Sequence, residues 1–255
     1  LPKNLQLAET VPDYDAPMNL PGYHVENRLA TPDEIRQLAA LIRKAKRPVI
    51  YAGGGIIASG ASEELVRLVR KTGVPVTTTL TGIGAFPSDD PLSLEFLGMH
   101  GSVAANYAVD HADLLLAFGV RFDDRVTGNV GQFASHCTIV HVDIDPSEIN
   151  KIKKCDLAII SDLKHALTEL NKVVEAPADL GPWHQQVAAW KKADPFDYDH
   201  KFDGILAQHA IHELWRQTKD RDAVIATGVG QHQMWTAQHY KFSRPRRWLS
   251  SGGLG

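Results

Sequence analysis

Apolar and polar positions alternate along this chain with two different periods, and the alternation predicts its elements. Thr31–Glu34 has the form of a capping box with proline at the first helical position, and apolar residues then recur three and four positions apart. This predicts a helix that ends before the apolar run Pro48–Ala52, which three glycines, Gly53–Gly55, follow. A second amphipathic helix is expected over about Glu63–Lys71, with Gly73 as its stop.

The same alternation continues through the middle of the chain. Runs of β-branched or apolar residues predict strands, and amphipathic runs predict helices. The strands are expected over Val74–Leu80, Leu114–Gly119, Thr138–Asp143 and Leu157–Ile160, and the helices over Ser102–His111, Ser147–Lys153 and Asp162–Val174. Strands that are apolar on both faces and alternate with helices indicate an α/β fold, in which a parallel sheet carries helices on both faces.

Shifts in composition divide the chain into four expected parts. Residues 1–27 carry four prolines and little periodicity, which predicts a connector from a preceding domain. Residues 28–175 form the predicted central domain, and residues 176–203 a linker with a helix over about Trp183–Lys192. We expect residues 204–255 to be the start of a second α/β domain, truncated in a glycine-rich turn. Its elements are expected at Ile205–Thr218 (helix), Ala223–Thr227 (strand), Gln233–Gln238 (helix) and near Trp248 (extended).

Composition and charge narrow the class of protein. Hydrophobic residues make up 44% of the chain and charged residues 22%, which is typical of a globular protein and excludes a disordered or collagen-like one. No run approaches the ~20 apolar residues of a membrane span. The two cysteines, Cys137 and Cys155, do not have the spacing of zinc ligands, and they favour a reducing compartment. The net charge of −3, with signs interspersed, predicts neither nucleic acid nor a membrane surface as a partner.

Candidate ligand-binding segments follow the predicted strands, because open parallel sheets bind ligands outside the carboxyl ends of their strands. Gly53-x-Gly55-x-x-Ala58 joins a strand to a helix, where glycines let a phosphate approach backbone N–H groups; a plain tight turn is the alternative. A classical NAD site also needs an acid ~20 residues further on. The chain has Thr77–Leu80 there, which weakens the case for NAD.

Three further segments of the central domain have the same placement. Gly98–Gly101 precedes a predicted helix, so it could meet a phosphate or a flavin edge, or simply hold a loop histidine. In Gly119–Arg125 the two arginines can each grip an oxyanion, although an internal salt-bridge cluster is the alternative. Asp143 ends a strand where an acid commonly accepts a ribose hydroxyl; helix N-capping by Asp145 before Pro146 is the alternative and is expected as well.

One segment of the second domain repeats the pattern. Gly228–Gln233 joins the predicted strand to a helix, and donors from Gln231, His232 and the helix N-terminus suit a diphosphate. The alternative is a capped turn with an exposed histidine.

At these segments the chain resembles a known family. GVRFDDRVTG at 119–128, LGMHG at 97–101, HVDID at 141–145, TGVGQHQMW at 227–235 and RRWLSSGGLG at 246–255 resemble the large catalytic subunit of acetohydroxyacid (acetolactate) synthase. The likeness runs along essentially the whole chain. It implies a transferase that decarboxylates pyruvate and joins the remainder to a second 2-oxo acid, in the biosynthesis of isoleucine, valine and leucine. It also implies thiamine diphosphate, magnesium and an FAD whose role is structural.

The resemblance assigns site residues motif by motif. For FAD it implies a lining of Gly54, Thr79, Leu80, Leu97, Gly98, Met99, His100, Gly119, Val120, Arg121, Phe122, Asp123, Asp143, Ile144, Asp162 and Leu163. For thiamine diphosphate it implies Gln231, His232 and Gly255, and for the substrate carboxylate Arg125. The main departure from the family pattern is Ser161, where glycine is expected.

The resemblance also implies what this chain lacks. The family subunit has three domains, and the chain is similar to the tail of the first, the whole flavin-binding second and the opening of the third. The activating glutamate of the first domain and the GDG…N segment that carries magnesium have no counterpart here, so no metal ligand is assigned. The chain is therefore expected to be a fragment without carboligase activity of its own.

Partners, compartment and competing functions complete the prediction. The resemblance implies pyruvate and 2-oxobutyrate as substrates, a homodimer or tetramer and a possible regulatory small subunit. The expected compartment is the cytoplasm of a bacterium, or a plastid if the source is a plant. Two alternatives remain: a free-standing dinucleotide-binding module, or a sister thiamine enzyme such as glyoxylate carboligase or an oxalyl-CoA decarboxylase. The GQHQMW and SSGGLG segments disfavour the module, and RFDDRVTG disfavours the sister enzymes.

Overall fold

The computed structural model describes residues 6–9, 11, 13–15 and 28–252, so most of the predicted connector 1–27 lies outside the described residues. The first unit contains α2 (Pro32–Lys44), β1 (Pro48–Ala52), α3 (Gly54–Ala58), α4 (Ser62–Thr72), β2 (Val76–Thr78), the 3₁₀ turn η1 (Leu80–Gly82), β3 (Ser93–Phe96), α5 (Val103–His111), β4 (Leu114–Phe118), α6 (Asp124–Thr127), β5 (Thr138–Asp143), β6 (Leu157–Ile160) and α7 (Leu163–Val173). After it come α8 (Gly181–Ala193), α9 (Ala207–Thr218), β7 (Ile225–Thr227), α10 (Gln231–His239) and β8 (Trp248–Ser250).

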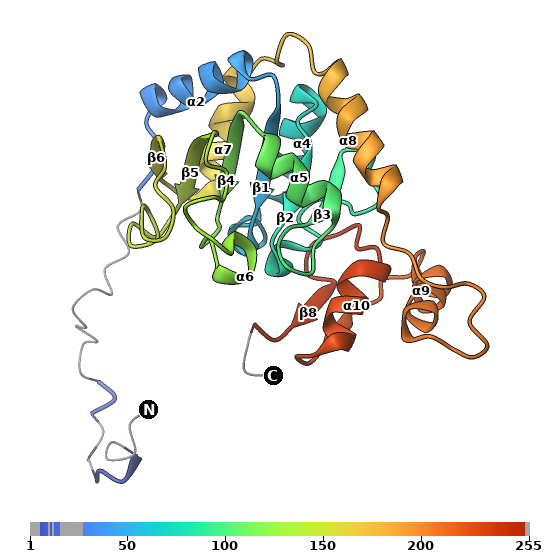
Figure 1. Ribbon diagram of the computed structural model, residues 1–255. Coiled ribbons are helices and arrows are strands. Elements are labelled where there is room, and N and C mark those ends of the chain that lie inside the picture. The colour runs from blue at the N-terminus through green and yellow to red at the C-terminus, as the bar shows by residue number, and fades with distance from the viewer. Residues whose placement is uncertain (1–5, 10, 12, 16–27, 253–255) are drawn as a thin grey trace.

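The first unit is a parallel sheet covered on both faces, which confirms the predicted fold class. Within the described residues its six strands lie in the order β3-β2-β1-β4-β5-β6, and every neighbouring pair is parallel. Helices α2, α4 and α7 pack together on one face, and α5 and α8 pack together on the other (Figure 1). The carboxyl ends of all six strands therefore share one edge, which faces the C-terminal segment in Figure 1.

Local signals in the sequence place the element boundaries. The Thr31 hydroxyl accepts a hydrogen bond from the Glu34 amide (3.3 Å), and the Glu34 carboxylate accepts one from the Thr31 amide (2.7 Å), so the predicted capping box is confirmed. Helix α4 ends at Gly73, whose φ of 70° lies in the left-handed region that glycine tolerates. The N-cap of α2 and the C-cap of α4 therefore mark the two ends of the helix–strand–helix segment that contains β1.

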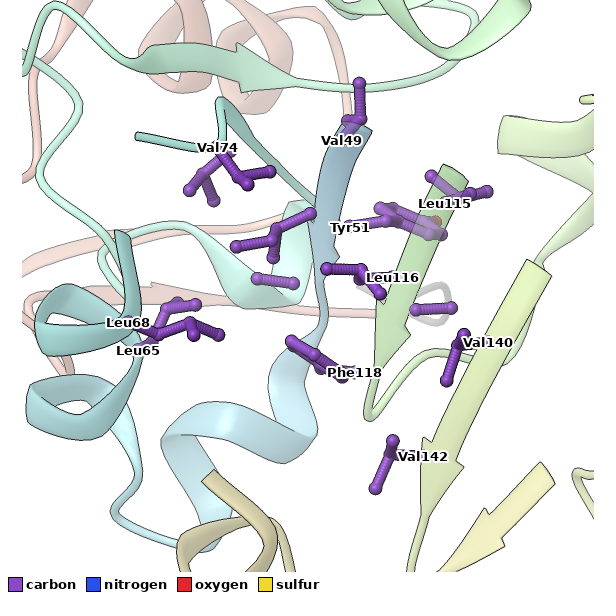
Figure 2. Close-up of a cluster of buried hydrophobic side chains, with 14 of the residues drawn as sticks. Val49, Tyr51, Leu65, Leu68, Val74, Leu115, Leu116, Phe118, Val140 and Val142 are labelled. Carbon is purple, nitrogen blue, oxygen red and sulfur yellow. The ribbon is translucent and has the colours of Figure 1, made fainter. Parts of the chain in front are cut away.

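The core lies between the sheet and its two helical layers. Figure 2 shows side chains of β1, β4 and β5 in one buried cluster with Leu65 and Leu68 of α4. Every residue of β1 and β4 is buried, which explains why both strands are continuous apolar runs. Burying one large aliphatic or aromatic side chain contributes about 1.5–3 kcal/mol to the stability of the fold. The cluster contains many such side chains, so it holds the strands, and with them their carboxyl ends, in fixed positions.

Two parts of the sequence prediction are wrong in detail. The strand β3 has no counterpart in the predicted elements, because it is a short edge strand with an irregular register against β2. The helix predicted over Ser147–Lys153 is a series of turns instead. Asn150 interrupts it with a φ of 59°, and the Asn150 side chain accepts a hydrogen bond from the Cys155 amide (2.9 Å).

The C-terminal segment packs against the loops after β2 and β3. Its β7 and β8 form a parallel two-stranded sheet, and α9 and α10 contact each other. A second apolar cluster joins the two units through Ile83 and Phe96 on one side and Tyr240, Phe242 and Trp248 on the other. The Trp248 indole donates a hydrogen bond to the Leu80 carbonyl (3.0 Å), and we call this whole contact the seam.

Candidate functional site

The strand order places the candidate site at a topological switch point. The chain builds β1, β2 and β3 outward in one direction and then returns to place β4 on the other side of β1. In such sheets the loops after the two central strands diverge and leave a crevice between them. The loops after β1 and β4 are the predicted segments that begin at Gly53 and Gly119, and the structure brings them together.

Close backbone contact explains the glycines of these two loops. The Gly53 amide donates to the Phe118 carbonyl (2.9 Å), and the Gly55 amide donates to the Gly119 carbonyl (3.3 Å). A Cβ on Gly53 would lie 1.9 Å from the Gly119 carbonyl oxygen, and one on Gly55 would lie 2.7 Å from the Gly119 Cα. The Gly-x-Gly pattern thus serves the packing of β1 against β4, and the tight turn that the sequence offered as an alternative is present.

The loop after β2 adds two hydroxyls to this edge. Thr79 caps η1 by accepting from the Gly82 amide (2.9 Å), and its hydroxyl lies 3.2 Å from that of Thr81. Thr81 is exposed, and its hydroxyl lies 3.0 Å from where a Cβ on Gly54 would stand. Sequence reasoning did not select Thr81, although a threonine two residues after Thr79 in a strand-end loop is the available signal.

The loop after β3 is tied to α6. The Met99 amide donates to the Arg125 carbonyl (2.9 Å), and Gly98 has a φ of 111°, with no room for a side chain against that carbonyl. Leu97 is buried, whereas Met99 is 66% exposed and His100 is exposed. The segments 97–101 and 119–128, which the sequence only placed at separate strand ends, are therefore adjacent.

Hydrogen bonds distinguish the two arginines in the loop after β4. Arg121 pairs with Asp123 (3.1 Å), whose other carboxylate oxygen accepts from the Arg125 amide (3.0 Å) at the start of α6. Val120 and Phe122 are buried, and Phe122 holds a φ of 51°, so it turns inward while its neighbours point outward. In the part of the chain that the structure describes, the Arg125 guanidinium meets no carboxylate. The salt-bridge alternative therefore applies to Arg121 and not to Arg125.

The end of β5 holds a buried acid next to a buried histidine. His141 Nε2 lies 3.0 Å from the Val120 carbonyl and 3.9 Å from the Asp143 carboxylate. Burial raises the pKa of Asp143 and lowers that of His141. Asp143 accepts from the Asp145 amide (2.9 Å), and the exposed Ile144 between them points outward. Asp145 accepts from the Ser147 amide (2.8 Å) and so caps a turn, not the predicted helix.

The residues that follow β6 make contacts that stabilise the fold. Asp162 caps α7 by accepting from the His165 amide (2.9 Å), and Leu163 is buried against the glycine contact between β1 and β4. Ser161 accepts from the Ala30 amide (2.9 Å) and ties the chain before α2 to this edge. A glycine could not make that bond, so the departure at Ser161 has a structural explanation.

The second-domain segment Gly228–Gln233 follows β7, whose end lines an open pocket. Gly230 has a φ of 145°, and Gln231 and His232 begin α10 with exposed side chains. Gln233 is buried and donates to the Ser250 hydroxyl (2.6 Å) and the Ser251 carbonyl (2.8 Å), so α10 is locked to β8. A pocket of about 450 Å³ is lined by Thr81, Ala226, Thr227, Trp248, Leu249, Ser250 and Ser251. Gly255 lies outside the described residues.

Similarity to known proteins identifies the family. A model of the central domain of thiamine pyrophosphate enzymes matches residues 35–170, more than half of the chain. The chain belongs to the thiamine pyrophosphate enzyme family. A second model, of the C-terminal TPP-binding domain of these enzymes, matches residues 228–255. The predicted family is confirmed at this level, and the two matches fall in the two units that the structure shows.

Curated relatives extend the match over the whole chain. The chain is 53% identical to acetolactate synthase 2, chloroplastic, of Zea mays, over 263 aligned positions that cover 100% of the chain and 40% of the relative. Acetolactate synthases named as chloroplastic from Oryza sativa subsp. japonica and Arabidopsis thaliana are 52% and 49% identical. The chain thus spans about 40% of the length of the curated relatives that it matches.

The residues present fit the cofactors of this family to different degrees. The edge of the six-stranded sheet where the strands have their carboxyl ends is called the central edge below. It offers hydroxyls, an acid and the exposed side chains of Met99, His100 and Ile144, and this mixed set suits an extended dinucleotide. The pocket lined by β7, β8 and Thr81 carries four hydroxyls, from Thr81, Thr227, Ser250 and Ser251, which suit a diphosphate. Among the described residues no group of three His, Cys, Asp or Glu side chains can hold a metal ion. No helix in the described part of the chain is long and apolar enough to cross a membrane.

Proposed function

We propose that this chain is part of an acetolactate synthase large subunit, a transferase that decarboxylates pyruvate and joins it to a second 2-oxo acid. The observation that carries the proposal is the identity of about half of all positions to acetolactate synthases along the whole chain. The matched residues include both strand-end loops that meet at the switch point. A free-standing module has no use for the residues 228–255, which match a TPP-binding domain.

The central edge is proposed to hold FAD. Its exposed members are Met99, His100, Arg121 and Ile144, and they come from three different strand ends on one side of the sheet. Asp143 stands where an acid accepts ribose hydroxyls in such folds. The buried members of the predicted set support the edge from below: Leu97, Val120, Phe122 and Leu163. The proposed flavin role is structural, because the net reaction moves no electrons.

Arg125 is proposed to bind the substrate carboxylate. Its backbone is held by Asp123 on one side and by Met99 on the other. Its guanidinium meets no carboxylate among the described residues, so it is free to form two parallel hydrogen bonds with a ligand. Thiamine diphosphate, when bound, supplies the reactive carbon and the electron sink for the chemistry. Gln231, His232 and Gly255 are the proposed contacts of its diphosphate.

The wider setting follows from the same relatives. We propose pyruvate and 2-oxobutyrate as substrates, magnesium held by residues outside this chain, and a homodimer or tetramer with a possible regulatory small subunit. The products would feed isoleucine, valine and leucine biosynthesis. Relatives named as chloroplastic favour a plastid over the bacterial cytoplasm.

Two measurements test the proposal. The intact protein, supplied with pyruvate, thiamine diphosphate and Mg²⁺, should form acetolactate, and this chain alone should bind FAD and quench its fluorescence. Asp143→Asn should weaken FAD binding, whereas Asp145→Asn, a matched change at an exposed turn cap, should not. A folded chain that leaves FAD fluorescence unchanged at high concentration counts against the flavin site, and an intact protein without acetolactate counts against the function.

A further inference from the structure

Glu95 has an unusual backbone for a residue inside a strand. Its φ is 64°, a left-handed value that is unfavourable for a residue other than glycine. The register of β3 against β2 shifts between Val76 and Thr78, so the strand is bulged beside Glu95. The Thr77 hydroxyl donates to the Glu95 carbonyl (3.0 Å), which holds the strained residue in place. Bulges of this kind redirect a side chain, and strain persists where surrounding contacts enforce it.

The redirected carboxylate crosses the seam. Glu95 pairs with Lys241, which follows the C-terminal end of α10. The two side chains are only 20% and 28% exposed, so water screens the pair less than it screens a surface ion pair. Lys191 of α8 lies near the same carboxylate and donates to the Ser93 and Pro91 carbonyls (2.7 and 3.0 Å). Glu95 is therefore an anion between two cations at the edge of the sheet.

The same end of α10 is held at other points. Lys241 also donates to the Gln238 carbonyl (3.3 Å), where a cation satisfies a helix C-terminus. The Gln238 side chain in turn donates to the His100 carbonyl (2.9 Å) in the loop after β3. The C-terminal end of α10 is thus fixed to the same loop that carries Met99 and His100.

The other end of α10 carries the proposed diphosphate contacts. The helix has nine residues, so at ~1.5 Å per residue its two ends lie roughly 13 Å apart. A short helix moves as one body, and a shift at Lys241 is transmitted to Gln231 and His232. The open pocket is lined by residues of β7 and β8, which flank α10 in the chain, and by Thr81 of the central unit, so its width depends on the seam.

We propose that the ion pair between Glu95 and Lys241 holds α10 in a fixed position relative to the carboxyl ends of the central strands. This position sets the affinity of the protein for thiamine diphosphate, and we call the ion pair the latch. The inference rests on the proposed function. Neither residue is among the proposed cofactor contacts; both act through α10. The left-handed backbone of Glu95 in the bulged strand and its ion pair with Lys241 occur together, and the latch gives this backbone a role.

The test measures binding of thiamine diphosphate with Mg²⁺ to the intact protein by calorimetry, together with bound FAD and the turnover rate at saturating cofactor. Glu95→Gln keeps the size of the side chain and removes its charge. We expect its Kd for thiamine diphosphate to rise on the order of tenfold, with FAD content and saturated turnover within about twofold of the parent protein. Lys241→Met should have the same effect.

Two controls keep the outcome decisive. Glu213→Gln breaks an exposed ion pair with Arg216 on the neighbouring α9, and it should leave the Kd unchanged. The exchange of both charges, Glu95→Lys with Lys241→Glu, should recover part of the lost affinity. An unchanged Kd in Glu95→Gln, or a parallel loss of FAD in both single variants, overturns the latch and leaves the proposed function standing. A parent protein that does not bind thiamine diphosphate overturns the proposed function instead.

Discussion

Polar residues at the strand ends fall into two groups that the sequence alone does not separate. Asp123, Asp143, Asp145 and Asp162 each accept with one carboxylate oxygen from a backbone amide of the next turn or helix. The Arg125 guanidinium, in contrast, meets no carboxylate within the described residues. Aspartate caps helices and binds ligands with the same oxygens, so residue type cannot decide between the roles. A carboxylate has a second oxygen, so Asp143 keeps its proposed role as the ribose acceptor beside its backbone hydrogen bond.

Arg125 is the residue whose proposed role is most open to test. In the intact enzyme Arg125→Lys should weaken use of the second 2-oxo acid, because an ammonium does not reproduce the two parallel hydrogen bonds of a guanidinium. Losing a charge-assisted hydrogen bond to a desolvated carboxylate costs about 1.5–3 kcal/mol, which is roughly 10–150-fold in kcat/KM. Competition between two 2-oxo acids, followed by product analysis, measures the change.

Arg121 provides the matched comparison four residues earlier. Its partner is Asp123, and its side chain is 72% exposed on the FAD side of the proposed site. Arg121→Lys should therefore reduce FAD affinity more than it changes the partition of products. If Arg125→Lys instead loses FAD or unfolds while product partition stays the same, Arg125 has a structural role.

At the scale of elements, buried strands were predictable and exposed turns were not. The expected strands at Pro48–Ala52 and Thr138–Asp143 have those bounds in the structure, since a strand buried on both faces must be an unbroken apolar run. The edge strand β3 carries Ser93 and Glu95 and so lacks this signal. The helix expected over Ser147–Lys153 failed because the side chain of Asn150 competes for a local amide, which periodicity does not reveal.

The stability of α10 depends on pH through His239, which packs against the segment between α8 and α9. His239 is 6% exposed, and its ring lies 6.4 Å from that of Phe196 and 5.6 Å from that of Tyr198. Burial, aided by Lys241 and His212 and opposed by Asp197, lowers the pKa of His239 from 6.5 to about 4. The unfolded chain therefore binds this proton more readily than the folded one. The stabilisation is complete above pH 6.5 and is lost as the pH falls toward 4.

Urea unfolding at pH 7 and pH 5 measures this effect. The free energy of unfolding should fall by about 1–2 kcal/mol between the two values on account of His239, and His239→Asn should remove that part of the fall. His136→Asn, at an exposed histidine away from α10, is the control and should leave the difference as it is. An equal fall in His239→Asn and the parent protein would contradict the assignment.

At the scale of the molecule, the seam was the part least accessible from sequence. The predicted parallel sheet follows from apolar runs, but the order that places β4 beside β1 depends on contacts between distant segments. The seam joins Leu80 to Trp248, and Glu95 to Lys241, with more than a hundred residues between the partners. No local pattern encodes such pairs. These long-range contacts determine how the two proposed cofactor sites are oriented relative to each other. The motifs at separate strand ends indicated the two sites but did not fix their relative orientation.

The seam also determines whether the two units unfold together. Phe242 is 2% exposed and packs against Tyr240 and Trp248, at ring distances of 4.7 and 5.2 Å. Ser88 of the central unit donates both its amide and its hydroxyl to the Phe242 carbonyl (3.0 and 3.1 Å). Phe242→Ala removes a fully buried ring from this contact, which typically costs 3–5 kcal/mol. A two-stranded sheet such as β7-β8 is at best marginally stable alone, so the loss falls on the C-terminal segment.

Hydrogen exchange of backbone amides resolves where that loss appears. In Phe242→Ala the amides of α10 and β8 should exchange faster by a factor of about a hundred or more, because a cost of 3–5 kcal/mol lowers the free energy of their local opening. The amides of β1 and β4 should keep their protection, since their core cluster does not include Phe242. Phe118→Ala, within that core, should give the reverse pattern. Equal acceleration of all four elements in Phe242→Ala would show instead that the two units form one cooperative unit and that the seam is part of a single core.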